Sequence, residues 1–198
     1  MNTITDIKTQ QRLLNLAGYG PLTVDGICGP LTRAALVRWH DAAATYALDT
    51  ATFDPRTEKN LSTLLPSVQR AVRLWLTHQA LPAAASLGYT LKIICGTRSW
   101  DEQAILYAQG RTRPGAKVTN ARAGSSFHNY GVAFDIGLFA ADGSYLTASG
   151  PYEQLFARAG APAGFHWGGH FKSLKDTPHY ESHAAGATIA ALKKNCQP

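Results

Sequence analysis

The chain has 198 residues and a formal net charge of +6, and 45% of its residues are hydrophobic. Such a chain can form one medium domain or two small ones, each with its own core. No segment approaches the roughly 20 apolar residues of a membrane span, and the start of the chain lacks the basic and apolar run of a signal peptide. We therefore expect neither membrane insertion nor export.

The chain has three cysteines, which are widely separated. Their number and spacing indicate neither a disulfide framework nor a metal knuckle, and we interpret them as small hydrophobic residues. They are Cys28, Cys95 and Cys196.

The excess positive charge lies in the second part of the chain. Up to Pro66, six Lys and Arg residues stand against six Asp and Glu residues, and from Ser67 onward the numbers are thirteen and seven. A basic surface favours polyanions such as nucleic acid, an anionic cell envelope or acidic groups of a substrate. The chain has no dense basic run with interleaved aromatic residues and none of the common nucleic-acid motifs, so we expect no nucleic-acid partner.

The first part of the chain follows a helical pattern. A short helix is predicted around Asp6 to Ala17, and the stretch GYGPLTVDGICGP, rich in Gly and Pro, then interrupts the pattern. A second helix is expected to begin with Pro30 at its first position. A third is expected to begin at the capping residue Asp54 and to run to about Leu65. Helical spacing buries Leu31, Ala34, Ala35 and Trp39 of the second helix and Leu61, Leu64 and Leu65 of the third.

Three segments of this helical part resemble the peptidoglycan-binding module found at the ends of many cell-wall hydrolases. They are QQRLLNLAGYG, VDGICGPLTRAALVRWH and TFDPRTEKNL, and the resemblance covers about residues 5–66. It is strongest in VDGICGPLT, although Cys28 stands where that family usually has an aromatic residue. His40 follows Trp39 where a Phe-Gln pair is common. The resemblance implies a small three-helix bundle, residues 1–66, that binds peptidoglycan.

The second part opens with an amphipathic helix that Ser67 can cap. A strand at about Leu91 to Cys95 follows, and then the segment GTRSWDEQAILYAQG, where Ser99 and Glu102 have the spacing of a capping box. The last glycine of this segment is expected to end the helix, and Arg98 lies at the junction of strand and helix. The buried face of the first helix is predicted to consist of Val68, Ala71, Val72, Trp75 and Leu76.

A long polar loop, residues 111–125, leads into the stretch SSFHNYGVAFDIG. Alternation predicts a strand over Gly131 to Ile136, with Val132, Phe134 and Ile136 toward the core and Gly131, Ala133 and Asp135 on the opposite face. The carboxylate of Asp135 then has two very small neighbours, which leave room beside it. His128 can fold over the same face if the glycine at 131 permits the turn.

A carboxylate and an imidazole that converge on a pocket suit a borderline cation such as Zn²⁺. Two ligands are too few, and the stretch GFHWGGHFKSLKDTPHYE supplies more candidates, although a single histidine in it also fits an ordinary polar residue. Pro178 favours an extended conformation for Thr177, so Asp176 is expected on a loop and His179 at the start of a strand. The candidates in this stretch are His166, His170, Asp176, His179 and His183.

Three separated motifs, SFHNYGVAFD, WGG and DTPHYE, resemble the zinc peptidase family that includes D-alanyl-D-alanine carboxypeptidases and L-alanyl-D-glutamate endopeptidases of bacteria and phages. GTRSWDEQAILYAQGRTRPG is similar to the arginine-bearing segment of that family, so the resemblance covers about residues 67–185. It implies a catalytic domain over residues 67–198 and an α+β fold, in which a small antiparallel sheet flanked by helices follows the helical bundle. The matching positions are Ser126, His128, Gly131, Ala133, Asp135, Asp176 and His179.

The resemblance also implies a metal site. His128, Asp135 and His179 would hold one zinc ion per chain, with water in the open fourth position. His170 stands where an acidic or amide residue is common in the family, which leaves a competing ligand open, and His166 is a further alternative.

The same resemblance assigns the chemistry. Asp176 would be the general base that takes a proton from the zinc-bound water, and Arg98 would stabilise the oxyanion of the tetrahedral intermediate. Ser126 and Gln103 are candidates for positioning the substrate. An aspartate at 176, rather than a glutamate, is associated with the endopeptidase branch of the family more than with the dipeptidase branch.

Together the two resemblances predict a phage-type endolysin, which waits in the host cytoplasm until the membrane is permeabilised and then acts on the cell wall. We expect a monomer whose partner is peptidoglycan and whose target is the L-Ala to D-Glu bond of the peptide stem. One alternative is a D,D-carboxypeptidase that trims the end of the stem. Another is a non-catalytic wall-binding protein with a structural or lost metal site, although Asp176 argues against it, because a structural site needs no base.

Overall fold

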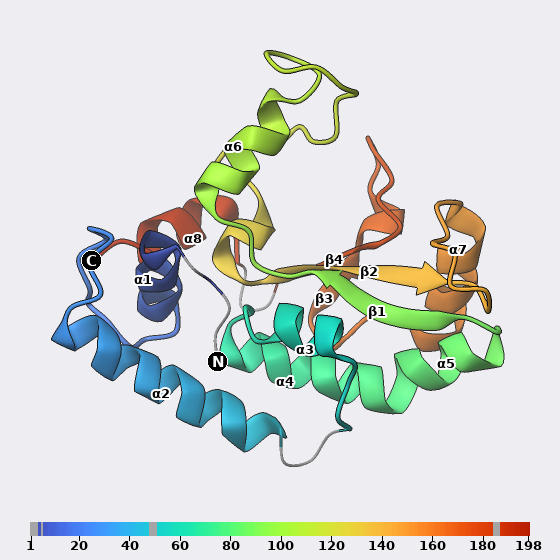
Figure 1. Cartoon of the computed structure of the whole chain (residues 1–198), viewed down its shortest axis with the longest axis horizontal. Coiled ribbons are helices and arrows are strands. Elements are labelled where there is room, and N and C mark those ends of the chain that lie inside the picture. The colour runs from blue at the N-terminus through green and yellow to red at the C-terminus, as the bar shows by residue number, and fades with distance from the viewer. Residues whose placement is uncertain (1–3, 5, 48–50, 184–186) are drawn as a thin grey trace.

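The computed structural model describes all residues except 1–3, 5, 48–50 and 184–186. Its described part contains a four-stranded antiparallel sheet with the strand order β1-β2-β4-β3, flanked by helices (Figure 1). This confirms the predicted α+β fold with a small antiparallel sheet. The strands are β1 (Thr90–Cys95), β2 (Ala133–Phe139), β3 (Phe165–Trp167) and β4 (His179–Ser182).

Helices α1 (Ile7–Leu16), α2 (Pro30–Ala47) and α3 (Pro55–Leu61) form where the sequence predicts them. The carboxylates of Asp6 and Asp54 accept hydrogen bonds from backbone N–H groups in the first turns of α1 and α3. Both residues are therefore N-caps, a position where aspartate is favoured. The third helix ends at Leu61 rather than near Leu65. Its three predicted core leucines, Leu61, Leu64 and Leu65, are nevertheless buried.

Helix α2 buries a narrower face than the sequence pattern indicates. Ala35 and Trp39 are buried as predicted, but Leu31 is 73% exposed and Ala34 is exposed too, so the prediction was wrong for these two. The buried face includes Thr32 instead, because α2 packs against α1 and α4 along one line of residues spaced by three and four.

Helix α3 packs directly on β1. The Thr57 hydroxyl oxygen accepts a hydrogen bond from the backbone N–H of Ile93 at 3.0 Å, and the Asn60 amide donates to the Ile93 carbonyl at 2.9 Å. Two residues beyond α3, the Thr63 hydroxyl accepts from the N–H of Thr97 at 2.8 Å. The helical part and the sheet also share one hydrophobic core, which includes Leu13, Leu61, Leu64, Trp75 and Phe134. The proposed division near residue 66 stays a prediction, and in the structure it falls inside a continuous packing interface.

The second part begins with a nearly continuous helical run, α4 (Pro66–Trp75), a π-helical turn η1 (Leu76–Ala80) and α5 (Leu81–Ser86). Leu65 precedes the first helical residue, and the predicted cap Ser67 is already inside the helix. The reason is Pro66, which has no N–H to satisfy and a φ angle that suits the first helical position. Of the predicted buried face, Val68, Val72, Trp75 and Leu76 are buried and Ala71 is half-buried.

This helical run covers one face of the sheet (Figure 1). The Trp75 ring lies 6.0 Å from the ring of Phe134 on β2 and 5.1 Å from that of Tyr180 on β4. Phe134 and Tyr180 are themselves stacked with their centroids 5.3 Å apart. Side chains of β2 and β4 that alternate with these two must point to the other face, which is therefore free to hold polar groups.

Helix α6 (Trp100–Ala108) and the 3₁₀ turn η2 (Phe127–Tyr130) lie beyond that other face. The capping box of Ser99 and Glu102 is present as predicted. Strand β2 begins at Ala133, two residues later than predicted, because Gly131 is in the left-handed region with φ 65°. The turn that the sequence required of this glycine is thus confirmed.

The remaining helices close the ends of the fold. They are α7 (Ser149–Ala159), the 3₁₀ turn η3 (Gly168–His170) and α8 (Ile189–Asn195). Residues 111–125 contain turns and one isolated bridge at Arg113, as expected for a loop. Among the described residues, no helix has the length and hydropathy that crossing a membrane needs.

Candidate metal centre

A row of three residues crosses the open face of the sheet. The antiparallel register places Asp135 on β2 opposite His179 on β4 and opposite Cys95 on β1. Directly opposed residues of neighbouring strands point to the same face. The aspartate in the predicted strand therefore belongs to a polar row, while its neighbours Phe134 and Ile136 lie in the core.

His128 completes a triangle with the other two predicted ligands. Its ring reaches the row from η2, across the left-handed turn at Gly131. Nε2 of His128 lies 3.2 Å from Oδ1 of Asp135, and Nδ1 of His179 lies 2.9 Å from the same oxygen. The two nitrogens are 3.2 Å apart. Two segments that are far apart in the sequence thus place three donor atoms around one point.

The donor atoms fit a zinc ion. Tetrahedral zinc with bonds of about 2.0–2.2 Å places neighbouring ligand atoms about 3.3–3.6 Å apart, slightly more than the sides of this triangle, which measure 3.2, 2.9 and 3.2 Å. The other ring nitrogens are engaged: Nδ1 of His128 lies 2.7 Å from the Gly96 carbonyl, and Nε2 of His179 lies 3.0 Å from Oε2 of Glu181. When Nδ1 of His128 and Nε2 of His179 carry the ring protons, the lone pairs of Nε2 of His128 and Nδ1 of His179 face the triangle.

The triangle is also an electrostatic unit when no metal is bound. Burial lowers the pKa of His128, but the charge and hydrogen bond of Asp135 outweigh it and raise that pKa to about 10. Burial would raise the pKa of Asp135, and the two imidazoles lower it. Without a metal, the carboxylate is therefore charged and holds a proton on its histidine partner. A metal ion must displace that proton to bind.

Glu181 forms a hydrogen bond with His179, and the sequence analysis did not predict it as part of the site. Its carboxylate lies 3.0 Å from Nε2 of His179 and 2.8 Å from Nε2 of His183, and these hydrogen bonds lower the pKa of Glu181 against the effect of burial. The signal was present in HYE, because residues i and i+2 of a strand share a face. On the other side, the ring of His166 stacks on His183 at 4.2 Å, so this candidate lies next to the supporting residues.

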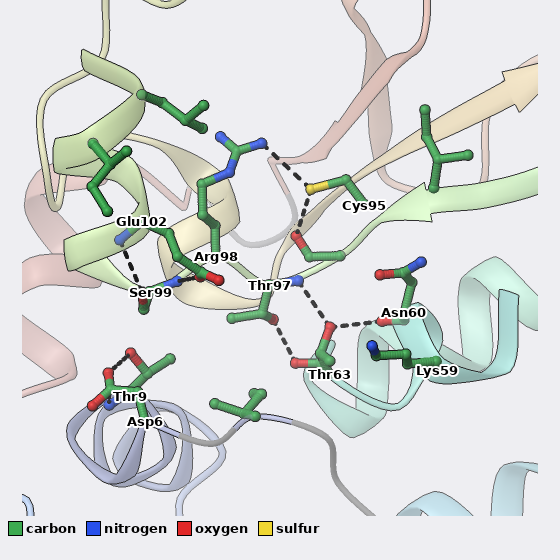
Figure 2. A pocket seen from close by; sticks show the side chains of 15 residues that line it. Asp6, Thr9, Lys59, Asn60, Thr63, Cys95, Thr97, Arg98, Ser99 and Glu102 are labelled. Carbon is green, nitrogen blue, oxygen red and sulfur yellow. Dashed lines mark hydrogen bonds between the residues drawn. The ribbon is translucent and has the colours of Figure 1, made fainter. Parts of the chain in front are cut away.

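Arg98 lies at the edge of the triangle, and it follows β1 at the junction with α6, where the sequence places it. Its Nη2 is 3.9 Å from Oδ2 of Asp135 and donates to the Cys95 sulfur at 3.4 Å (Figure 2). Its Nη1 donates to Oε1 of Gln103 at 2.8 Å, and the Gln103 amide donates to the carbonyl of Ala121 at 2.7 Å. Gln103 is fully buried. Gln103 therefore orients Arg98. The sequence resemblance predicts that Gln103 positions the substrate, and a direct contact would require its side chain to reach the surface.

Cys95 lies beside the triangle. Its thiol sulfur is 3.8 Å from Nδ1 of His128, and it forms with His128 and Asp135 a cluster of donor atoms within 4.8 Å of one another. Interpreting it only as a small hydrophobic residue was wrong, because the strand register brings it into the polar row. The nitrogen that it faces already contacts the Gly96 carbonyl, so the sulfur flanks the donor triangle.

Asp176 lies on an exposed loop before β4, as predicted. Its N–H donates to the Gly168 carbonyl at 3.0 Å, and its own carbonyl accepts from the N–H of His179 at 3.1 Å. Partial loss of water around its carboxyl group and the charge of Asp135 raise the pKa of Asp176, against the charges of His179, His128 and Arg98. The carboxyl group is thus within the electrostatic field of the triangle.

Two predicted residues have other surroundings. Ser126 precedes η2 and exchanges capping hydrogen bonds with Asn129, so its side chain holds the turn that carries His128. His170 is exposed and packs edge-on against the rings of Phe156, 4.9 Å away, and Trp167, 5.1 Å away. The described contacts do not bring His170 into the triangle.

Comparison with known proteins places this centre in a peptidase context. The family model described as D-alanyl-D-alanine carboxypeptidase matches residues 119–182, which include the whole triangle and Asp176. The part of the chain that holds the centre is similar to a family of peptidases.

One curated relative and one solved structure illustrate the similarity. The peptidoglycan L-alanyl-D-glutamate endopeptidase CwlK of Bacillus subtilis (strain 168) is 43% identical over 107 residues, which are 50% of this chain and 64% of that relative. The chain thus covers slightly less than two thirds of this relative. The crystal structure of the L-Ala D-Glu endopeptidase ChiX of Serratia marcescens aligns with a TM-score of 0.48 and 23% identity, over 71% of this chain and 97% of that one.

Proposed function

We propose that this protein is a zinc-dependent peptidase that hydrolyses the L-Ala to D-Glu amide in the peptide stem of peptidoglycan. The observation that carries the proposal is the triangle of donor atoms from His128, Asp135 and His179, in which the second ring nitrogen of each histidine is engaged outside the triangle. It lies in the segment similar to peptidases, and the similarity to an L-alanyl-D-glutamate endopeptidase supports the choice of bond.

The residues around the triangle have separable roles in this reaction. When bound, zinc would polarise the scissile carbonyl and make water easier to deprotonate. Asp176 takes the proton from the attacking water and passes it to the leaving amine. Arg98, held by Gln103, donates hydrogen bonds to the oxyanion that the carbonyl oxygen becomes when water attacks. Glu181 keeps the ring of His179 in place.

A second candidate is a D,D-carboxypeptidase that removes the terminal D-Ala of the stem. The family description that matches residues 119–182 favours this reaction. Mass spectrometry of purified peptidoglycan after digestion distinguishes the two. The endopeptidase leaves L-Ala with a free carboxyl group on the glycan and peptides that begin with D-Glu, whereas the carboxypeptidase releases free D-Ala.

The cellular role that we propose is that of a phage-type endolysin, with one zinc ion per monomer and access to the wall after membrane permeabilisation. It is supported by the sequence resemblance of residues 5–66 to wall-binding modules. A zymogram on purified wall, with and without chelator, tests the enzyme against the alternative of a non-catalytic wall-binding protein. Clearing that the chelator abolishes is expected. No clearing in either lane would contradict the proposal.

A further inference from the structure

A pocket of about 810 Å³ lies beside the triangle (Figure 2). Three parts of the chain contribute side chains to its lining. They are Ile4, Asp6 and Thr9 around the start of α1, Lys59, Asn60 and Thr63 around the end of α3, and nine residues between Ile94 and Leu106 at the end of β1 and in α6. Its volume is in the range of pockets that hold small-molecule ligands. The helical part and the sheet part of the protein therefore build this pocket together.

The pocket and the metal centre share two residues. Cys95 and Arg98 line the pocket, and the same side chains flank the triangle, with Nη2 of Arg98 3.9 Å from Oδ2 of Asp135 and the sulfur 3.8 Å from Nδ1 of His128. A ligand in the pocket therefore lies next to the groups that would hold the scissile amide.

The floor of the pocket is preformed. Thr63 accepts a hydrogen bond from the N–H of Thr97, and Asn60 donates to the Ile93 carbonyl. At Gly96 an added Cβ would collide with the Asn60 carbonyl and the Thr63 hydroxyl, so only glycine permits this close approach of α3 to the end of β1. A rigid floor reduces the entropy lost when a ligand binds.

The lining suits a neutral ligand with both polar and methyl groups. Lys59 and Arg98 are balanced in formal charge by Asp6 and Glu102, and hydroxyl and amide groups lie between them. The apolar contacts come from Ile4, Ile94, Ile105 and Leu106, and Ile105 is 50% exposed on α6. The half of the stem that begins with D-Glu carries several carboxylates, for which this balanced lining offers no net attraction.

We infer that this pocket binds the N-acetylmuramyl sugar that carries the stem peptide, an inference that rests on the proposed function. In peptidoglycan the lactyl group of this sugar is joined to L-Ala, so the L-Ala to D-Glu amide is one residue away from it. An extended residue spans only about 3.3–3.6 Å. With that amide at the triangle, the sugar reaches the neighbouring pocket, where its acetamido methyl group meets the apolar side chains and its hydroxyl groups meet the polar ones.

The first test compares two substrates with the zinc-loaded full chain. N-acetylmuramyl-L-Ala-D-Glu contains the sugar, and N-acetyl-L-Ala-D-Glu replaces it by an acetyl group. We expect kcat/KM to be about tenfold or more higher for the sugar-containing substrate, the factor that about 1.4 kcal/mol of additional binding supplies. If both are cleaved with equal kcat/KM, the pocket inference is wrong and the proposed function stands. If neither peptide nor wall is cleaved, the proposed function itself fails.

The second test fills the pocket. Ile105→Trp places a large neutral side chain in it, and Ala104→Trp places the same side chain at the adjacent exposed position of α6, which does not line the pocket. Ile105→Trp should bring the ratio of the two kcat/KM values close to one and leave the sugar-free substrate unaffected, whereas Ala104→Trp should keep the wild-type ratio. An equal loss on both substrates, or a loss confined to stems extended beyond D-Glu, would overturn the inference.

A binding measurement needs neither turnover nor a variant. Calorimetric titration of the zinc-loaded protein with N-acetylmuramyl-L-alanine, the sugar-bearing product, should show saturable binding to one site, and acetyl-L-alanine should bind at least about tenfold more weakly. Equal affinities of the two ligands would contradict the inference.

Discussion

Glu181 accepts a hydrogen bond from Nε2 of His179 at 3.0 Å, while Nδ1 of the same ring points to the donor triangle at 2.9 Å from Asp135. The strand explains why. Glu181 and His179 are two residues apart on β4, so their side chains share the face that carries the centre. The carboxylate fixes which nitrogen of the ring faces a metal ion and increases its basicity.

Replacing Glu181 should therefore weaken zinc binding. Glu181→Gln keeps the size of the side chain but removes its charge, and residues in this position typically contribute 10- to 100-fold, so we expect a loss of about that size in zinc affinity. Competition with a chromophoric chelator measures it. Glu153→Gln, an exposed position on α7, is the matched control and should bind zinc like wild type. Unchanged zinc affinity in Glu181→Gln would contradict the role given to Glu181.

The two aspartates of the centre should respond differently to the same change. Asp176→Asn keeps the shape of the side chain but cannot accept a proton from water, so the zinc content should stay and turnover should fall by about 10²- to 10⁴-fold. Asp135→Asn replaces a ligand carboxylate by an amide, a poorer zinc ligand, and should lower the zinc content itself. Zinc content and rate are measured side by side. Loss of zinc from Asp176→Asn with retention in Asp135→Asn would mean that the roles are exchanged.

The resemblance to the zinc peptidase family implied the full ligand set, and the residues themselves indicated two local features of the site. Gly131 indicated the turn that lets His128 reach Asp135, and Pro178 indicated the break between the loop of Asp176 and β4. Both features follow from backbone preferences that a sequence displays directly.

What the sequence did not predict depends on strand register and on packing between distant segments. Cys95 enters the polar row because β1 pairs with β2 in one register, and Gln103 is buried where it bonds both Arg98 and the carbonyl of Ala121. In the same way, Leu31 satisfies the helical period of α2, but the described residues leave it 73% exposed. Such contacts join segments whose distance in space the sequence pattern does not contain.

The stability of the metal-free protein should depend on pH, because zinc and a proton compete for His128. In the metal-free protein the pKa of His128 is raised from 6.5 to about 10, because the stabilisation by Asp135 exceeds the cost of burial. Folding then stabilises the protonated ring, so this contribution is complete below pH 6.5 and is lost as the pH rises toward 10. Zinc requires the deprotonated ring, so its affinity increases as the pH rises over the same range.

We therefore expect the melting temperature of chelated protein to fall between pH 6.5 and 10 and the stabilisation by added zinc to increase. Thermal melts of both forms in this range measure the effect. His128→Gln should reduce both trends, because it removes one of the two histidines of the triangle whose pKa is raised. A zinc-induced shift of the melting temperature that decreases toward pH 10 would contradict the competition between zinc and protons.

The interface between α3 and β1 should make the first 66 residues necessary for the stability of the sheet. Thr57 is 2% exposed, and its hydroxyl accepts the hydrogen bond of the Ile93 N–H in the middle of β1. Thr57→Val keeps the shape but leaves that buried N–H without its acceptor, which costs about 1–3 kcal/mol. Thr45→Val is the matched control, because the Thr45 hydroxyl donates only to the Asp41 carbonyl on an exposed turn of α2. Urea unfolding of the two variants should show a lower free energy of unfolding for Thr57→Val and little change for Thr45→Val.

A chain that begins at Ser67 lacks Thr57, Asn60 and Thr63 together, so its sheet should unfold at lower urea concentration than that of either variant. If such a chain unfolds at the same concentration as the full chain, α3 contributes nothing to the sheet and the two parts are independent domains.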